Sequence, residues 1–375
     1  MADLSTNYLK PIGTIFVNLL KFIVVPVVLL SMIDGIVSMG DIKKLGSVGW
    51  KTVAMFMITT AIACTIGLII ASVFKDAGLF PTTLTLAEGA KWEKATSANF
   101  MDTIVNIFPS NMWDAFVKAN MLQVIVISIF LGGSILAAGD KAKLAIDVVR
   151  TFYSVIEKLM AFIISLSPIG VFTMISWVVA TQGPEILGSL GLVILCAYIA
   201  YAIHTGLIYS ISIALFSDNS PAEFFKKSAP AMLFAFTSTS SAATLPVSTK
   251  SADDLGCDKA IASFVLPLGS TINMNGTAIY QCVATVFLGA LCGIDLSLGQ
   301  LLTVVVTSVL ASIGTAGTPG AGMIMLAMVL TAIGIPTDMI MIIFGVDRLF
   351  DMGRTCLNVT GDICTACCVT KWEKK

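Results

Sequence analysis

The sequence has few charged residues and a single histidine. Asp, Glu, Lys and Arg make up 12% of its 375 residues, and His204 is the one histidine. A soluble domain has about 25% charged residues to cover its surface. His204 lies in an apolar stretch without a serine or cysteine nucleophile motif, so we interpret it as a packing residue rather than a catalytic one. The composition therefore excludes a soluble fold, and we do not expect an enzyme.

We expect no cleavable signal peptide at the N-terminus, because residues 1–10 are mostly polar and lack the basic, apolar and small-residue order of such a peptide. The nine cysteines are scattered along apolar stretches, which is typical of small buried side chains rather than of a disulfide framework. Cys364, Cys367 and Cys368 form a CxxCC cluster on one side of a predicted helix. No second ligand pair lies near it in the sequence, so we favour packing over metal binding or redox chemistry.

Long apolar stretches dominate the chain, which is 57% hydrophobic with a mean hydropathy of +0.93. One membrane crossing needs about 20 apolar residues. The stretches that satisfy this are residues 11–38, 49–74, 119–138, 152–180, 187–216, 257–291 and 337–368. We therefore expect an all-α membrane protein with about seven transmembrane helices in contact with lipid. The net charge of −1 identifies no partner, and no nucleic acid is expected.

Lysine and arginine are concentrated in alternate loops, which predicts the orientation in the membrane. The basic loops contain Lys43, Lys44, Lys51, Lys141, Lys143, Arg150, Lys226, Lys227, Lys250, Lys259, Lys371, Lys374 and Lys375. The loops of the other group have no excess of lysine or arginine. We therefore expect a multi-pass protein of the plasma membrane with a cytoplasmic C-terminus.

Two segments rich in Gly, Ser, Thr and Pro interrupt the apolar stretches. They are residues 235–250, AFTSTSSAATLPVSTK, and residues 312–322, SIGTAGTPGAG. Non-helical backbone at membrane depth survives only where it is buried in protein or lines an aqueous cavity. Because apolar arms flank both breaks, we interpret them as two re-entrant helical hairpins of an inverted-repeat transporter. A pair of long polar loops is the alternative.

The last apolar stretch contains a polar stripe. Its members Asp347, Asp351, Arg354, Asn358 and Asp362 are spaced 4, 3, 4 and 4 apart, on one face of a helix. Arg354 can bind a carboxylate with two parallel hydrogen bonds, and Asp351 can accept from an ammonium. The stripe therefore predicts a site for a zwitterion with an extra carboxylate, with a purely structural salt-bridge ladder as the alternative.

A second polar motif, NMNGT at residues 273–277, interrupts another apolar stretch. Amide and hydroxyl oxygens, carbonyl groups near Gly269 and the Asp362 carboxylate are the oxygen donors that a hard cation prefers. We predict a sodium site here, and a simple helix kink is equally compatible with the motif.

These motifs together resemble one family. TLPVSTK, PLGSTINMNGTAIYQ, ASIGTAGTPGAGMIMLAMVL and DMGRTCLNVTGD occur in this order and are similar to the hairpins and core helices of the glutamate transporter homologues, the dicarboxylate/amino acid:cation symporters. The resemblance covers residues 8–375. It implies a homotrimer with a scaffold in residues 1–216, whose third helix joins the core, and an elevator-like transport core in residues 217–375. It also implies symport of aspartate or glutamate with sodium, without any cofactor.

The resemblance assigns roles to individual residues. Asp351 would bind the amino group, Arg354 the side-chain carboxylate, and Thr355 and Asn358 the main-chain carboxylate. The further substrate contacts would be Thr277, Ser241, Thr318 and Gly322. A first sodium site would contain Gly269, Asn273, Asn358 and Asp362. A second would contain Thr271, Ser312, Ile313 and Thr315, and a third Thr59, Thr60 and Asn273. Asp347 and Arg348 would extend the charge network.

The chain departs from the family pattern in four ways. Asn275 and Phe56 replace an aspartate and a tyrosine, which removes oxygen ligands from the third sodium site and predicts fewer coupled sodium ions. Thr239 replaces an arginine of archaeal members, and Arg348 would compensate for it. Gln281 replaces a glutamate that animal members link to proton and potassium coupling, so we expect neither ion to be countertransported. About ten polar residues precede residue 11, where the family has a further span, so we expect the usual first helix to be absent.

Other functions remain compatible with the sequence. A cystine or dicarboxylate carrier, a proton-coupled variant, and an uncoupled anion-conducting or non-transporting relative are the alternatives. A carrier of neutral amino acids is disfavoured, because Arg354 would lie buried without an anion.

Overall fold

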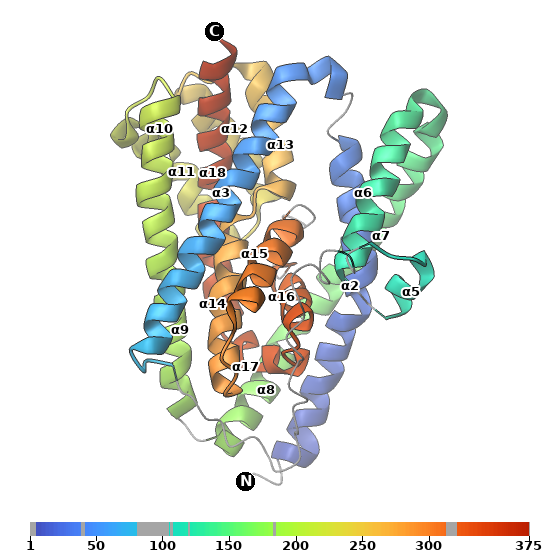
Figure 1. Ribbon diagram of the computed structural model, residues 1–375, viewed down its shortest axis with the longest axis vertical. Helices are drawn as coiled ribbons and strands as arrows, with labels where there is room; N and C mark the ends of the chain where they lie inside the picture. The colour runs from blue at the N-terminus through green and yellow to red at the C-terminus, as the bar shows by residue number, and fades with distance from the viewer. Residues whose placement is uncertain are drawn as a thin grey trace.

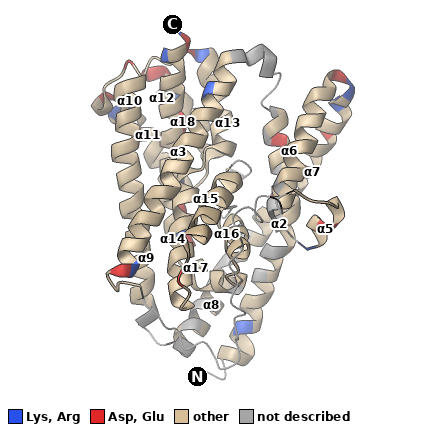
Figure 2. Cartoon of the chain, viewed as in Figure 1, with Lys and Arg blue, Asp and Glu red and all other residues tan. Residues whose placement is uncertain are grey.

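The computed structural model describes residues 5–38, 42–80, 105, 108–118, 121–182, 185–312 and 321–374. These residues form helices and turns, with no strand among them. The long helices run along the long axis of the molecule (Figure 1). Charged residues lie mostly towards its two ends, with few in the middle (Figure 2). This distribution fits a protein that crosses a membrane.

Four helical stretches of the described chain are long and apolar enough to cross a membrane: Ser47–Asp76, Val126–Gly170, Leu187–Phe216 and Lys259–Leu291. The longest of them includes the turn at Gly139, where φ is +58°. The expected stretches at 11–38 and 337–368 are also largely helical, but they do not meet the same criteria of length and composition. The number of seven spans therefore stays a prediction.

One group of helices surrounds α2 (Lys10–Ser38). It consists of α6 (Met121–Ala138), α7 (Lys143–Ser165) and α8 (Ser167–Gln182), each of which packs against α2. The short α5 (Met112–Val117) contacts α6. In Figure 1 α2, α5, α6 and α7 lie together on the right side of the molecule.

The second group surrounds α14 (Asn275–Leu291) and α18 (Asp347–Glu373). Every residue of α14 is buried. Its neighbours include α3 (Ile42–Asp76) and α9 (Glu185–Ile203), while α13 (Lys259–Ile272) packs on α18. The core of the protein therefore lies around two helices that carry predicted site residues.

Helices α9 and α10 (Ser210–Phe216), joined by the π-helix His204–Tyr209, contact α18. His204 is buried there, with its ring edge-on to Tyr209 at a centroid distance of 5.0 Å. From the sequence we expected α9 and α10 to belong to the scaffold in residues 1–216, and α3 to be the scaffold helix that joins the transport core. The division into scaffold and transport core stays a prediction.

The first predicted hairpin consists of α11 (Pro221–Ser238) and α12 (Ser241–Asp254), which pack against each other. Only Thr239 and Ser240 separate them, with Thr239 in the left-handed region at φ 54°. The polar segment is thus far more helical than its composition indicated. Its hydroxyl groups are satisfied within the helices, because Thr244 and Ser248 donate to carbonyls four residues back, at 2.7 and 3.2 Å.

The second predicted hairpin consists of α15 (Leu298–Ser312) and α16 (Ala321–Ile333), which also contact each other. The connection between them lies outside the described residues. The chain then passes through the 3₁₀ turn Thr337–Met339 and α17 (Ile340–Phe344) to α18. Both hairpins therefore have the two arms that the apolar flanks predicted.

Ion pairs join the ends of the second group of helices. Lys51 on α3 pairs with Glu373 at the end of α18 at 2.6 Å, and Lys75 at the other end of α3 pairs with Asp295 at 2.5 Å. Lys371 donates to the carbonyl of Ser217 at 2.9 Å. Lys51 and Lys371, both from the basic loops, thus lie at the same end of the molecule as the C-terminus.

The Lys75–Asp295 pair predicts a small pH effect on stability. The hydrogen bond and charge of Lys75 lower the pKa of the exposed Asp295 carboxyl. A lowered pKa in the folded state gives stability that is present above the ordinary carboxyl pKa and is lost as the pH falls through the lowered value. Asp295→Asn should therefore lower the thermal midpoint slightly at neutral pH and not in acid. Thermal unfolding at both pH values measures this, and an equal shift for Asp76→Asn would contradict it.

Candidate functional site

The NMNGT motif marks an interruption between two helices. Helix α13 ends at Ile272 and α14 begins at Asn275. Asn273 closes the first helix by donating its N–H to the Gly269 carbonyl at 2.9 Å. Its backbone then turns away from the helix, at φ −90° and ψ 86°. The break places the amide side chains of Asn273 and Asn275 inside the protein, next to α18.

The stripe on α18 faces the protein interior along its whole length. Its members Asp347, Asp351, Arg354, Asn358 and Asp362 are between 2% and 5% exposed. Arg348, the next residue after the first member, is exposed instead. The helical spacing thus correctly predicted one polar face, and this face packs against α14 and hairpin arms rather than lipid.

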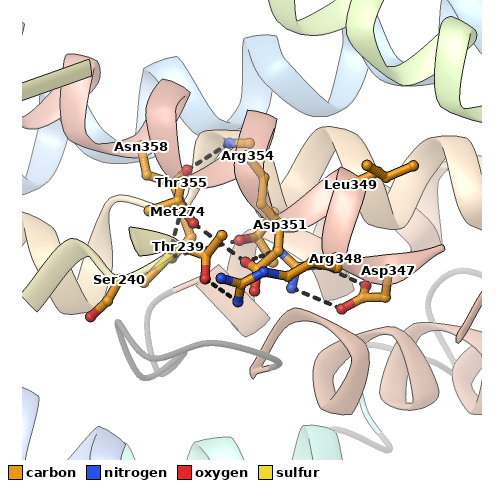
Figure 3. A network of polar contacts seen from close by, with 12 residues as sticks. Thr239, Ser240, Met274, Asp347, Arg348, Leu349, Asp351, Arg354, Thr355 and Asn358 are labelled. Carbon is orange, nitrogen blue, oxygen red and sulfur yellow. Dashed lines mark hydrogen bonds and ion pairs between the residues drawn. The ribbon is translucent and has the colours of Figure 1, made fainter. Parts of the chain in front are cut away.

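Arg354 is the centre of a buried charge cluster (Figure 3). Its Nε donates to Asp351 Oδ1 at 2.8 Å, and its Nη1 and Nη2 donate to the two carboxylate oxygens of Asp347 at 3.1 and 3.4 Å. Thr355 also donates to Asp351 Oδ1, at 3.3 Å. A guanidinium has five N–H donors, so two remain after these three bonds. The cluster has two carboxylates for one permanent positive charge.

Two further groups define the walls around the guanidinium. The ring of Tyr280 lies 4.9 Å from Arg354 Cζ, in cation–π geometry. On another side Gly322, in the first turn of α16, comes so close that a Cβ there would lie 2.6 Å from Cζ and Nη1. A Cβ at position 322 would therefore require the Arg354 guanidinium to shift. Gly322 is a predicted substrate residue, and the structure brings it to the predicted anion-binding group.

Arg348 reaches the first hairpin. Its Nη1 donates to Thr239 Oγ1 at 2.5 Å, at the turn between α11 and α12 (Figure 3). From the sequence we expected Arg348 to compensate for the arginine that Thr239 replaces. The side chains of Thr239 and Arg348 are in contact. Ser241, the predicted substrate residue two positions later, is buried at the start of α12.

A third buried carboxylate, Asp362, lies one helical turn beyond Asn358. Asn273 Nδ2 donates to Asp362 Oδ1 at 2.8 Å and to the Asn358 carbonyl at 3.3 Å. A Cβ at Gly269 would overlap Asp362 Oδ1. The four residues of the first predicted sodium site thus lie together. In the described chain the Asn273 Oδ1 atom is buried without a hydrogen-bond partner.

The Asn358 side chain links the two clusters. Its Oδ1 accepts the Gly276 N–H at 2.7 Å, and its Nδ2 points at Met274 Sδ at 3.1 Å. Thr277 Oγ1 also approaches Met274 Sδ, at 3.8 Å. Asn358 and Thr277 are therefore near each other, at the start of α14.

The third predicted sodium set is arranged differently. Thr60 donates to Asn275 Oδ1 at 2.6 Å, and Asn275 Nδ2 donates to Tyr209 OH at 2.9 Å. Tyr209 in turn donates to the Leu357 carbonyl at 3.2 Å. Asn275 thus uses both side-chain atoms within the protein, whereas Thr59 donates back to its own helix at Met55 and Phe56.

The second predicted sodium set is described only in part. Thr271 and Ser312 donate to carbonyls of their own helices, at 3.0 and 2.7 Å. Ile313, Thr315 and the substrate candidate Thr318 lie outside the described residues.

Three contacting residues escaped the sequence reasoning. Tyr280 and Met274 lie within the quoted motif, so their proximity to the site could have been noted. Tyr209 stands in an apolar stretch 66 positions from Asn275, and nothing in its surroundings signals a contact.

The profile of the Sodium:dicarboxylate symporter family matches residues 1–372 of the chain. The chain belongs to the sodium:dicarboxylate symporter family. The resemblance seen in the motifs is thereby confirmed. Members of the sodium:dicarboxylate symporter family are transporters and not enzymes, as the composition predicted.

Individual relatives of the symporter family differ in the ions and substrates in their names. A proton/sodium-glutamate symport protein of Geobacillus stearothermophilus is 33% identical over 98% of this chain and 88% of its own length. A proton/glutamate-aspartate symporter of Escherichia coli (strain K12) is 33% identical over 99% and 87%. A C4-dicarboxylate transport protein of Bacillus subtilis (strain 168) is 32% identical over 98% and 88%.

Proposed function

We propose that this chain is a secondary active symporter of acidic amino acids, aspartate or glutamate, coupled to sodium. The proposed identity of the substrate rests on one observation, the buried Arg354 between two hairpins. Its two uncommitted N–H groups can hold a side-chain carboxylate, and Asp351 beside it can accept from an ammonium. Thr355 and Asn358 are within one turn of Arg354 for the main-chain carboxylate.

The observation that supports a cation is Asp362. This carboxylate is 2% exposed, and within the described chain its one hydrogen bond comes from the neutral Asn273 amide. A buried carboxylate without a positive partner is costly. Asn273, which bonds to Asp362, also donates to the Asn358 and Gly269 carbonyls, and its own side-chain oxygen has no hydrogen-bond partner in the described chain. Such oxygen atoms are the donor type that sodium would use. Sodium bound there would supply the missing charge.

Uptake into proteoliposomes tests the coupling ion. We expect an inward sodium gradient at constant pH to drive concentrative uptake of labelled aspartate, and Asp362→Asn to abolish the sodium dependence. Uptake driven by a proton gradient without sodium would replace this proposal with a proton-coupled carrier. Aspartate currents without concentrative uptake would indicate an uncoupled relative.

Asn275 predicts the stoichiometry. Because both its side-chain atoms are used by Thr60 and Tyr209, it offers no carboxylate for a third ion. We expect fewer than three sodium ions per transported molecule, and Asn275→Asp to increase the sodium dependence of uptake. Flux reversal potentials in proteoliposomes measure the number directly. Three coupled sodium ions in the natural protein would contradict the prediction.

Transport of C4-dicarboxylates is the second candidate. One argument against it is that a dicarboxylate has no ammonium group to face Asp351. The structure weakens this argument, since Arg354 already donates to Asp351, and a Bacillus subtilis relative has the name of a C4-dicarboxylate carrier. Competition with labelled aspartate separates the classes. We expect glutamate to compete better than succinate, serine or cystine, and the reverse order for succinate would favour a dicarboxylate carrier.

We further propose a homotrimer in the plasma membrane, with the C-terminus in the cytoplasm and an elevator movement of the core. Two observations support this arrangement. The helices around α2 and those around α14 and α18 form two packing groups that contact each other less than the helices within each group do. Basic residues from several loops lie at the C-terminal end of the molecule, the side that the distribution of lysines assigns to the cytoplasm.

A further inference from the structure

The last helix contacts a fourth cysteine that the CxxCC cluster lacked in the sequence. Cys257 lies in the turn between α12 and α13, 110 positions before Cys367. Its Sγ is 3.2 Å from Cys367 Sγ, and both thiols are free. The described residues contain no group of three or more His, Cys, Asp or Glu side chains placed to hold a metal ion. The pair is therefore a dithiol without further ligands.

The backbone holds the two sulfur atoms together. Gly256 adopts φ +76°, and Cys257 donates its N–H to the Ala252 carbonyl at 3.0 Å, which closes α12 with a tight turn. The next residue, Asp258, donates its N–H to Thr370 Oγ1 on α18 at 3.2 Å. Two adjacent contacts thus fix the turn against the last helix.

The pair also lies at the surface end of the helices. Charged residues flank the turn, and Cys257 retains 8% exposure against 3% for Cys367. The hydrogen bond with Cys367, which outweighs burial, lowers the pKa of the Cys257 thiol. A lowered pKa raises the thiolate fraction, which is the nucleophilic form. Cys257 is thus the more exposed and the more reactive partner of the two.

We propose that Cys257 and Cys367 form a redox-sensitive dithiol that a hydroperoxide converts reversibly into a disulfide, joining the base of the first hairpin to the last helix. A disulfide has an S–S length of about 2.05 Å, so the sulfur atoms must approach by little more than 1 Å from 3.2 Å. In a reducing compartment such bonds are transient and act as sensors.

The chemistry balances in two steps. The Cys257 thiolate attacks one oxygen of the hydroperoxide, the O–O bond breaks, and an alcohol or water leaves, which gives a sulfenic acid. Cys367 sulfur then attacks Cys257 sulfur, the S–O bond breaks, and hydroxide leaves with the Cys367 proton as water. The two thiols lose two electrons and the peroxide gains them. A dithiol reductant reverses the reaction.

The chain contains an internal comparison. Cys64 on α3 and Cys282 on α14 are also neighbours, but both are fully buried in the helical core. A hydroperoxide should not reach them. If contact between thiols were sufficient, both pairs would be oxidised. If the oxidant must also reach the thiols, only Cys257 and Cys367 should be oxidised.

Peptide mapping of the purified full-length protein tests the proposal. The protein is treated with hydrogen peroxide, alkylated with N-ethylmaleimide, digested without reductant and measured by mass spectrometry. We expect most of Cys257 in a peptide joined to Cys367, lighter by two hydrogens than the separate peptides and released by dithiothreitol. Cys64 and Cys282 should stay alkylated after denaturation. Sulfoxide at Met112, which is 40% exposed, shows that the oxidant acted.

Cysteine variants identify the two residues that form the disulfide. Cys257→Ser and, independently, Cys367→Ala should abolish the joined peptide, whereas Cys368→Ser should retain it. Full alkylation of Cys257 and Cys367 in a sample whose Met112 is oxidised would overturn the proposal. So would a bond from Cys367 to Cys364 or Cys368 instead of Cys257.

Discussion

Arg354→Ala should lower aspartate uptake by about 30-fold or more, since truncating one partner of a buried charge pair costs about 2–5 kcal/mol and each 1.4 kcal/mol is tenfold. The guanidinium is 2% exposed and is flanked by the Tyr280 ring and Gly322. Without it a substrate carboxylate would meet Asp347 and Asp351 with no compensating charge. The measurement is initial uptake of labelled aspartate in proteoliposomes.

Loss of uptake must be separated from loss of folding, because Asp347 and Asp351 would also be left buried without a cation. Size-exclusion profiles show whether the variant is folded, and serine uptake shows whether its substrate site is still intact. A folded variant should lose aspartate transport and keep or gain serine transport, since serine has no second carboxylate. Arg150→Ala is the matched control, because that side chain is 53% exposed and pairs with Asp34 elsewhere. Unchanged aspartate uptake in Arg354→Ala would refute the assignment.

Gly276→Ala should destabilise the protein by about 1–3 kcal/mol, the usual cost of overpacking, and eliminate most transport. A Cβ at this position would lie 2.5 Å from the Arg354 Cα, with other Arg354 main-chain atoms equally close. Both sides of this contact are helix backbone, so neither can move aside as a flexible side chain would. The new methyl group would also separate the Gly276 N–H from Asn358 Oδ1.

Gly289→Ala provides the control in the same helix. A Cβ there would find its nearest atom, the Ile294 carbonyl oxygen, at an ordinary 3.5 Å. We expect this variant to keep its thermal midpoint and its uptake. Equal thermal midpoints for the two variants would show that the crossing of α14 and α18 is looser than described.

Much of the site could be predicted because its information is local. The five polar residues of α18 share one face by spacing alone, and all are buried. The NMNGT motif predicted a helix break, and the apolar flanks predicted two pairs of hairpin arms. Periodicity and composition act over one helix, so they are visible in the sequence.

The contacts between distant segments could not be predicted in this way. Thr60 and Asn275 are 215 positions apart, and Arg348 and Thr239 are 109 apart. The pairing of Arg354 with Asp347 in addition to Asp351 depends on side-chain directions within the packed core. The composition of residues 235–250 also indicated less helix than the structure has. Hydroxyl groups that bond to their own helix let a polar sequence remain helical.

The ion pairs at the two ends of α3 have a mechanical consequence. Lys51 fastens one end to α18 and Lys75 fastens the other to the loop after α14, while the middle of α3 packs along α14. A helix that is held at both ends and packed along its length moves together with the helices that hold it. In the proposed elevator movement, α3 would therefore move together with α14 and α18 past α2, and the sliding surface would lie between two helices that are consecutive in the chain.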